Sequence, residues 1–220
     1  MKIAILYSGL PNNFDEFFHN HYTYLYQDYD VDTYLSSYVI DNQSYQQINN
    51  IIKLLKPKNI DIENFDKVQA QLIEIKNQYI NNIRPECNAI NSLSMFYKIF
   101  KVFQLINNKT DKYDIIVRNR LDIKFVKNIT FYKNNKLNVP CGGDHHGGLL
   151  DLFGYGDYHV MRQYSSLFNF IARYCSEGTV FHPETLLRLH CYQSGIDINR
   201  FDFDIYLRDI NFTQTAPCIK

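Results

Sequence analysis

The segment that decides the fold is Tyr113–Phe125, YDIIVRNRLDIKF. Its apolar run at residues 115–117 predicts a short buried strand. Polar residues follow at once, because Arg118, Arg120 and Asp122 are separated from each other by single residues. In an extended chain this spacing places the three side chains on the same face. Two guanidiniums and a carboxylate at a strand end predict an anion site or, alternatively, a structural ion pair.

Strands and helices alternate on the N-terminal side of this segment. KIAILYSG (residues 2–9), DVDTYLSSYV (30–39) and KNIDIEN (58–64) predict strands. Helical patterns cover residues 12–27, 42–56, 65–83 and 88–107. Beyond residue 130 the pattern is mixed, with strands on both sides of a glycine-rich loop, helices over 157–174 and 182–195, and final strands within 196–209. We therefore predict one α/β domain over residues 1–220, with a mostly parallel sheet and a late antiparallel addition.

Length, charge and cysteine content exclude several classes of protein. The chain has 220 residues and a formal net charge of zero, which gives no sign of a nucleic-acid partner. No window approaches the run of about eighteen apolar residues that a membrane helix needs, and the N-terminus does not read as a signal peptide. Its five cysteines are scattered without a CxxC motif, so we expect reduced thiols and a cytoplasmic protein.

A ligand of an open α/β sheet binds beyond the carboxyl ends of its strands. Ser8, Gly9 and Leu10 follow the first strand, where we expect backbone amides to face a ligand. Arg118 and Arg120 would reach the same crevice, and arginine forks pair with phosphate oxygens. The negative charge of Asp122 would repel a phosphate unless a divalent cation bridges the two.

The segment GGDHHGG, residues 142–148, is the second unusual stretch. Its glycines allow sharp turns or close approach to a ligand, and we interpret Gly143, His145 and His146 as part of a sugar-binding loop. Asp144 and the two histidines are also candidates for metal binding or acid–base chemistry. The alternative is a flexible loop with solvated polar tips.

Two further acids are candidate catalytic groups. Asp151 lies in LLDLFGYG, where a carboxylate inside an apolar strand is costly without a partner. It would act as a general base, orient a sugar hydroxyl, or make a buried structural hydrogen bond. Glu184 follows Pro183 at a predicted helix start, where it would favour the helix dipole and pair with Arg188. His190 shares an apolar helix face and is interpreted as a core histidine.

Motifs of several large enzyme classes are missing from the sequence. It contains no GxGxxG, GxxxxGK[ST], HExxH or GxSxG. This argues against classical dehydrogenases, P-loop kinases, zincins and α/β-hydrolases.

An ordered set of segments nevertheless resembles a known family. The segments are KIAILYSGLPNNF, SMFYKIFKVFQL, YDIIVRNRLDIKF, GGLLDLFGYGDYHVMRQYSSLF and HPETLLRLH. In this order they resemble the small GT-A nucleotide-sugar glycosyltransferases of bacterial surface-polysaccharide clusters and large DNA viruses. A viral member would work in the host cytoplasm.

The resemblance implies a Rossmann-like α/β/α sandwich and a site at the end of a central strand. In this family a DxD motif holds Mn²⁺ or Mg²⁺ against the donor diphosphate. Asp122 matches its first carboxylate, whereas Lys124 stands where the second would be. Ser8, Gly9, Leu10, Arg118 and Arg120 would bind a UDP- or GDP-sugar donor. Asp122 completes the implied donor site.

The implied reaction is transfer of a hexosyl or deoxyhexosyl group to a glycan or a glycolipid or glycoprotein precursor. Asp151 would deprotonate the acceptor hydroxyl in an inverting enzyme, with Asp144 and Glu184 as further candidates. Gly143, His145 and His146 would contact the acceptor or sugar. Two alternatives remain. One is a sugar nucleotidyltransferase, and the other is a non-catalytic carbohydrate-binding protein with a degenerate GT-A frame, which Lys124 favours.

Overall fold

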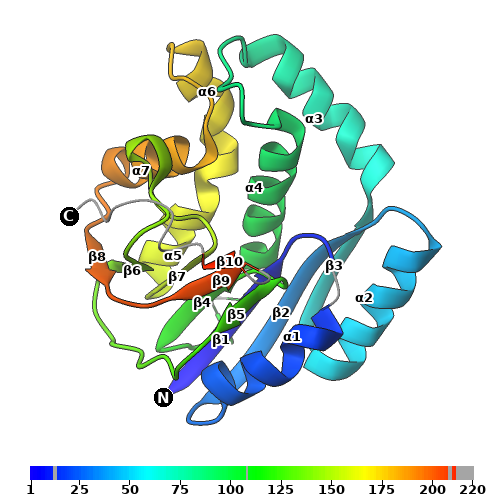
Figure 1. Ribbon diagram of the computed structural model, residues 1–220, viewed down its shortest axis with the longest axis vertical. Coiled ribbons are helices and arrows are strands. Elements are labelled where there is room, and N and C mark those ends of the chain that lie inside the picture. Colours follow the sequence, from blue (N-terminus) through cyan, green and yellow to red (C-terminus); the bar gives the residue numbers. More distant parts are fainter. Residues whose placement is uncertain (12–13, 108, 208–209, 212–220) are drawn as a thin grey trace.

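A seven-stranded sheet forms the centre of the computed structural model (Figure 1). The structure describes residues 1–11, 14–107, 109–207 and 210–211. Its strand order is β3-β2-β1-β4-β7-β6-β8. The strands are β1 (Lys2–Ser8), β2 (Asp30–Val39), β3 (Asn59–Asn64), β4 (Ile115–Asn119), β6 (Leu137–Pro140), β7 (Phe153–Gly156) and β8 (Ile198–Phe201).

The sheet is parallel in one half and mixed in the other. Strands β3, β2, β1 and β4 run parallel, and Ile5 of β1 lies between Thr33 of β2 and Val117 of β4. Strand β7 is antiparallel to both β4 and β6, while β8 is parallel to β6. The predicted fold class, a mostly parallel α/β sheet with a late antiparallel addition, is confirmed.

The segment Tyr113–Phe125 is not one continuous strand, so the predicted alternation is wrong beyond Asn119. Asn119 is the last residue of β4 with ladder partners on both sides, Tyr7 and Phe153. Past it the chain turns at residues 121–122 and enters β5 (Ile123–Phe125). Strand β5 pairs with β9 (Ile205–Leu207), and β9 pairs with β10 (Ile210–Asn211), in a second, antiparallel sheet.

Helices flank the sheet. They are α1 (Phe14–His21), which a π-helical turn at Tyr22–Tyr26 continues, α2 (Asn42–Leu55), α3 (Phe65–Tyr79), α4 (Ala89–Gln104), α5 (Tyr158–Ser165), α6 (Ile171–Ser176) and α7 (Pro183–Gln193). In the described part of the chain, no helix has the length and hydropathy needed to span a bilayer.

Two predicted helices end earlier than their periodicity suggests. Helix α3 stops at Tyr79, because the chain beyond it becomes extended and Ile83 forms a parallel bridge with Phe181. The predicted helix over 157–174 breaks into α5, a 3-10 turn at Ser166–Phe170 and α6. Its predicted N-cap is confirmed, since the Asp157 carboxylate accepts a hydrogen bond from the Val160 amide at 2.9 Å.

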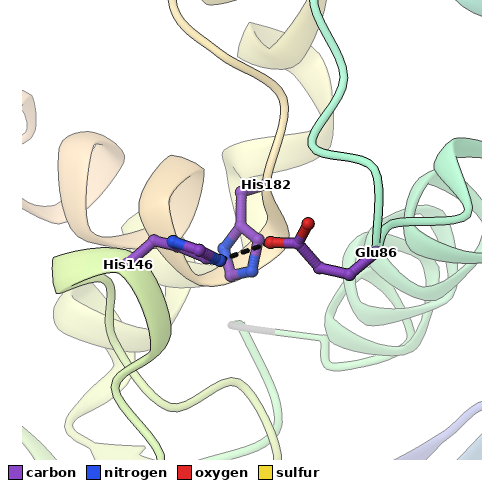
Figure 2. Close-up of side chains that lie close together, drawn as sticks. All are labelled: Glu86, His146 and His182. Carbon is purple, nitrogen blue, oxygen red and sulfur yellow. Dashed lines mark ion pairs between the residues drawn. The ribbon is translucent and has the colours of Figure 1, made fainter.

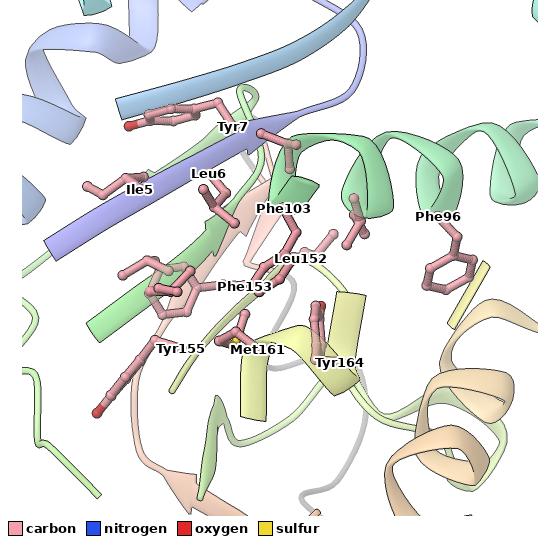
Figure 3. Close-up of a cluster of buried hydrophobic side chains, with 14 of the residues drawn as sticks. Ile5, Leu6, Tyr7, Phe96, Phe103, Leu152, Phe153, Tyr155, Met161 and Tyr164 are labelled. Atoms are coloured by element: carbon pink, nitrogen blue, oxygen red, sulfur yellow. The ribbon is translucent and has the colours of Figure 1, made fainter. Parts of the chain in front are cut away.

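Strand β1 has apolar side chains on both faces. Figure 3 shows Ile5 and Tyr7 on one side of β1 and Leu6 on the other, toward Phe103 of α4 and Met161 of α5. All of these side chains are buried. This two-sided burial explains why the strand reads as a continuous apolar run rather than an alternating one.

Gly148, the last residue of the glycine-rich segment, packs directly on the first turn of α7. A Cβ at this position would lie 2.4 Å from the carbonyl carbon of Glu184 and 2.7 Å from the amide nitrogen of Thr185. Backbone atoms cannot yield as a side chain can, so we expect Gly148→Ala to destabilise the protein by about 1–3 kcal/mol. Thermal unfolding measures this.

Gly154 in β7 provides the matched control for that substitution. Its added Cβ would lie 3.6 Å from side-chain atoms of Leu137 and Val139 and 3.7 Å from the carbonyl oxygen of Asn138, which are ordinary contacts. Gly154→Ala should therefore leave the unfolding midpoint close to that of the wild type. Equal midpoints for Gly148→Ala and the wild type would contradict the predicted clash.

Candidate functional site

A pocket of about 480 Å³ opens at the carboxyl ends of β1, β2 and β4. We call it the first pocket. It brings together the segment after β1, the end of β4 with the turn that follows, and the N-terminal part of α4. Its lining includes every residue predicted to bind the donor, together with one candidate base: Ser8, Gly9, Leu10, Arg118, Arg120, Asp122 and Asp151.

Arg118 is a buried cation with unused hydrogen-bonding capacity. Its side chain is 1% exposed, and Nη1 donates to the carbonyl oxygen of Leu152. Its Nε and Nη2 atoms have no hydrogen-bond partner among the described residues. Burial lowers the pKa of Arg118, yet a guanidinium stays charged at neutral pH. The charges of Asp151 and Asp122 act on this guanidinium, but neither carboxylate hydrogen-bonds to these two nitrogens, so the first pocket offers two donors to an anion.

Arg120 and Asp122 form a two-pronged ion pair. Arg120 Nε lies 2.7 Å from Asp122 Oδ1, and Nη2 lies 2.8 Å from Oδ2. Burial raises the pKa of Asp122, but the hydrogen bonds and charge of Arg120 outweigh it and hold the pKa below its usual range. Asp122 is therefore ionised, and both of its oxygens are engaged.

The surroundings of Asp122 do not fit a divalent cation. The guanidinium of Arg120 already supplies the positive charge, and the carboxylate is the acceptor of that bidentate pair. Lys124, in place of a second carboxylate, extends its ammonium over the ring of Phe17, 5.2 Å from its centroid. No group of three His, Cys, Asp or Glu ligands forms around Asp122 within the described residues.

Asp151 lies in the segment before β7, and not inside the strand as predicted. It is 7% exposed and lines the first pocket. Burial raises the pKa of Asp151, and the charges of Arg118 and Arg120 oppose this rise only in part. A carboxylate with a raised pKa that faces a pocket is suited to accept a proton.

The backbone amide and carbonyl groups of Gly9 are both hydrogen-bonded to β2. Its amide donates to the carbonyl oxygen of Ser36 at 3.2 Å, and its carbonyl oxygen accepts from the Ser37 hydroxyl at 2.7 Å. The amide of Gly9 is therefore not free to bind a ligand as predicted. Ser8 Oγ, which is buried and without a partner among the described residues, is the polar group that this segment presents to the first pocket.

Asp144 anchors the glycine-rich loop. Both of its carboxylate oxygens accept from Arg200 Nη2, at 2.6 and 2.7 Å, and Oδ1 also accepts from the Leu150 amide at 3.2 Å. Asp144 is 4% exposed and Gly143 is buried as well. The loop is held in place at this point, and the structure does not bring Asp144 or Gly143 to the first pocket.

Glu184 supports the same loop from α7. Its Oε2 accepts a hydrogen bond from the amide of His145 at 2.5 Å. Arg188, its predicted partner, instead donates to the carbonyl oxygen of Gly147 at 2.8 Å. Burial, with repulsion from Asp151 as a smaller cause, raises the pKa of Glu184 to about 9. A carboxyl that keeps its proton at neutral pH is not a base there, so Asp151 is the stronger candidate.

A second pocket, also of about 480 Å³, adjoins the first and shares the lining residues Asn91, Ser92 and Pro183 with it. His145 and His146 line this second pocket, and so do Glu86 and His182. Figure 2 shows Glu86, His146 and His182 converging from three separate segments. Glu86 and His182 were not among the predicted site residues, because no local spacing links either residue to the glycine-rich loop.

Comparison with known proteins identifies the fold. No family model matches the chain, and no curated protein matches its sequence. The solved structure of mouse xyloside xylosyltransferase 1, in its apo form, is similar, with a TM-score of 0.51 and 10% sequence identity over 92% of this chain and 86% of that chain. The chain thus has the α/β fold of a glycosyltransferase.

Proposed function

We propose that the chain is a glycosyltransferase that moves a sugar from a nucleoside-diphosphate sugar to a hydroxyl group. The observation that carries this proposal is Arg118, whose buried guanidinium lines the first pocket with two unpaired nitrogens. A diphosphate is an anion that would satisfy both nitrogens. The fold is similar to that of a xylosyltransferase, which supports a sugar nucleotide as the molecule that contains this diphosphate.

The donor would be a UDP- or GDP-sugar with its diphosphate at Arg118 and Arg120. Asp122 would hold the Arg120 fork in position, and Ser8 Oγ would donate a further hydrogen bond. As the bond to the sugar breaks, negative charge develops on the leaving diphosphate. Two guanidiniums that are already in place stabilise this charge without reorganisation, and such preorganised charge is a large contribution to catalysis.

The proposed reaction has no step through a cation at Asp122. The engagement of both carboxylate oxygens by Arg120 and the position of the Lys124 ammonium over the ring of Phe17 argue for charge neutralisation by arginine. Mn²⁺ or Mg²⁺ at Asp122 stays a prediction that the donor-binding experiment tests directly.

The acceptor would enter through the second pocket, which shares lining residues with the first. His145 and His146 line its wall, so they would contact a glycan or the sugar of a glycolipid or glycoprotein precursor. Asp151 would accept the proton of the acceptor hydroxyl as that oxygen attacks the hexosyl or deoxyhexosyl carbon. This assignment applies to an inverting reaction.

Donor binding is tested by thermal unfolding against UDP-, GDP-, CMP- and dTDP-sugars, each with Mn²⁺ and with EDTA. A ligand at about 100 times its dissociation constant adds roughly 2.7 kcal/mol of stability. For a chain of this size we expect the midpoint to rise by roughly 5–10 °C with one nucleotide. The rise should persist in EDTA, because arginines carry the charge.

Arg118→Met supplies the matched variant. It removes a buried cation with two unpaired nitrogens, so the ligand-free protein should stay as stable as the wild type while the donor-induced rise disappears. A rise that is lost in EDTA would show that a metal ion takes part in donor binding. No rise with any donor, or an equal rise in Arg118→Met, would contradict the proposal. Binding without transfer would indicate a carbohydrate-binding protein.

A further inference from the structure

We propose that Glu86, His146 and His182 form a site for one zinc-class divalent metal ion, with an open coordination position that faces the second pocket. We call these residues the Glu86–His146–His182 cluster. The proposal concerns residues other than Asp122, and it does not depend on the proposed function.

The spacing of the side chains suits a single ion. One potential ligand atom from each residue lies within 4.8 Å of the other two. Metal–ligand bonds of 2.0–2.2 Å place the ligands of a tetrahedral zinc ion about 3.4 Å apart, so small side-chain rotations complete the geometry. His146 Nε2 is already in contact with Glu86 Oε1, and the two imidazole rings lie 4.7 Å apart at an angle of 78°.

The ligand types select the metal. Two imidazoles and one carboxylate are ligands that Zn²⁺ and its transition-metal neighbours accept, whereas Mg²⁺ and Ca²⁺ favour sites made of oxygen alone. His182 Nδ1 lies 3.4 Å from the Thr185 hydroxyl, which leaves Nε2 for the ion. A partner on the other ring nitrogen orients a ligating histidine and is common around protein-bound zinc.

The turn that carries His146 is fixed from two sides. The amide of His145 donates to Glu184, and Arg188 donates to the carbonyl oxygen of Gly147. His146 itself has a φ angle of +51°, a conformation that this anchoring maintains. The buried His182 precedes α7, while Glu86 lies in the segment before α4. Three separate elements therefore present their ligands to one point.

The Glu86–His146–His182 cluster is open to solvent and supplies only three ligands to an ion. The side chains of Glu86 and His146 are 49% and 39% exposed and line the second pocket together with His182. Three protein ligands leave a fourth position to water or to an oxygen of a bound molecule, as in catalytic rather than structural zinc sites. An ion here would hold an oxygen ligand at the opening between the two pockets.

Metal titration tests the proposal. Wild-type protein, freed of metal with EDTA and then of EDTA, is titrated with Co²⁺ by optical absorption and with Zn²⁺ by calorimetry. We expect one ion per chain and the intense absorption of four-coordinate Co²⁺. Glu86→Gln and His146→Ala should each weaken binding by at least about tenfold, since even residues that only orient a ligand contribute 10–100-fold.

Controls separate the cluster from other metal-binding groups. Cys87 also lines the second pocket, so Cys87→Ser should bind Co²⁺ and Zn²⁺ as the wild type does. His159→Ala removes an exposed histidine outside both pockets and should also leave binding unchanged. Glu86 and His146 are exposed, so their variants should unfold at the wild-type midpoint without metal.

Two outcomes would overturn the proposal. One is equal Zn²⁺ affinity in wild type and in the double variant Glu86→Gln/His146→Ala. The other is loss of binding in Cys87→Ser while that double variant binds normally, which would assign the ion to the thiol.

Discussion

Asp151→Asn is expected to lower the rate of sugar transfer by about 10²–10⁴-fold while donor binding is retained. Asparagine has nearly the same shape as aspartate but accepts no proton under these conditions. The donor-induced rise in unfolding midpoint should persist or increase, because a negative charge close to Arg118 and Arg120 disappears. Transfer assays at saturating donor, together with the thermal-shift measurement, separate catalysis from binding.

The pH profile gives a second readout of the same role. Burial raises the pKa of Asp151 above its ordinary value of about 3.9. A base works only when ionised, so wild-type transfer should fall as the pH drops through this raised pKa, at a pH where an exposed aspartate is still charged. The residual activity of Asp151→Asn should lack this fall. If Asp151 had a purely structural role, the residual activity of the variant would show the same fall with pH as the wild type.

Asp157→Asn is the matched control for Asp151→Asn. Asp157 caps α5 and lies outside both pockets, and asparagine caps a helix equally well. This variant should transfer sugar at the wild-type rate. If Asp151→Asn also retained that rate, Asp151 would be removed from the role of base.

Lys98→Met is expected to cost about 3–5 kcal/mol of stability, near the lower end of that range. The Lys98 side chain on α4 is 0% exposed, and its Nζ lies 2.9 Å from Asp61 Oδ2 and 2.7 Å from Glu63 Oε2. It also sits 4.3 Å above the ring of Tyr38. Methionine fills a similar volume, so the loss reflects two carboxylates that no longer contact the buried cation. Urea unfolding at pH 7 measures it.

The destabilisation should depend on pH with a definite sign. Burial raises the pKa of Asp61, but hydrogen bonds from Ser36 and Lys98 outweigh it, so the folded-state pKa is below the usual range. Such a group stabilises the fold above its unfolded pKa, and this contribution is lost as the pH falls through the folded pKa. The difference between wild type and Lys98→Met should be full at pH 7 and smaller below about pH 4.

Lys101→Met tests whether burial is the cause. Lys101 Nζ also contacts Asp61, at 3.4 Å, but its side chain is 31% exposed. Solvent screens this partly exposed pair, and ion pairs that contact solvent contribute about 0–1 kcal/mol, so this variant should unfold close to the wild type. Equal urea midpoints for the two lysine variants would contradict the importance that we assign to the buried cation.

Local patterns alone determined much of the fold. The apolar runs at residues 2–9 and 115–117 correctly predicted two central strands, and Asp157, Pro183 and Gly195 correctly marked helix ends. His190 was correctly interpreted as a core residue, since it is buried, with Nδ1 2.9 Å from the Tyr174 hydroxyl and Nε2 2.8 Å from the Gln163 carbonyl oxygen. These features depend on backbone propensity and periodic burial, which neighbouring residues encode.

The scattered spacing of the five cysteines led to the prediction of reduced thiols. Among the described residues, Cys87, Cys175 and Cys191 are free cysteines, and reduced thiols for the whole chain stay a prediction. Cys218 lies outside the described residues.

Only the tertiary structure decided which polar side chains meet. The strand through Arg118 breaks after Asn119 because its neighbours end there, and the turn joins Arg120 to Asp122. Asp144 pairs with Arg200 on β8. Glu86, His146 and His182 lie close together although they belong to three separate segments. Partners of charged and ligating groups depend on which loops the sheet order brings to one edge. That order follows from packing the whole core, so no stretch of sequence carries it by itself.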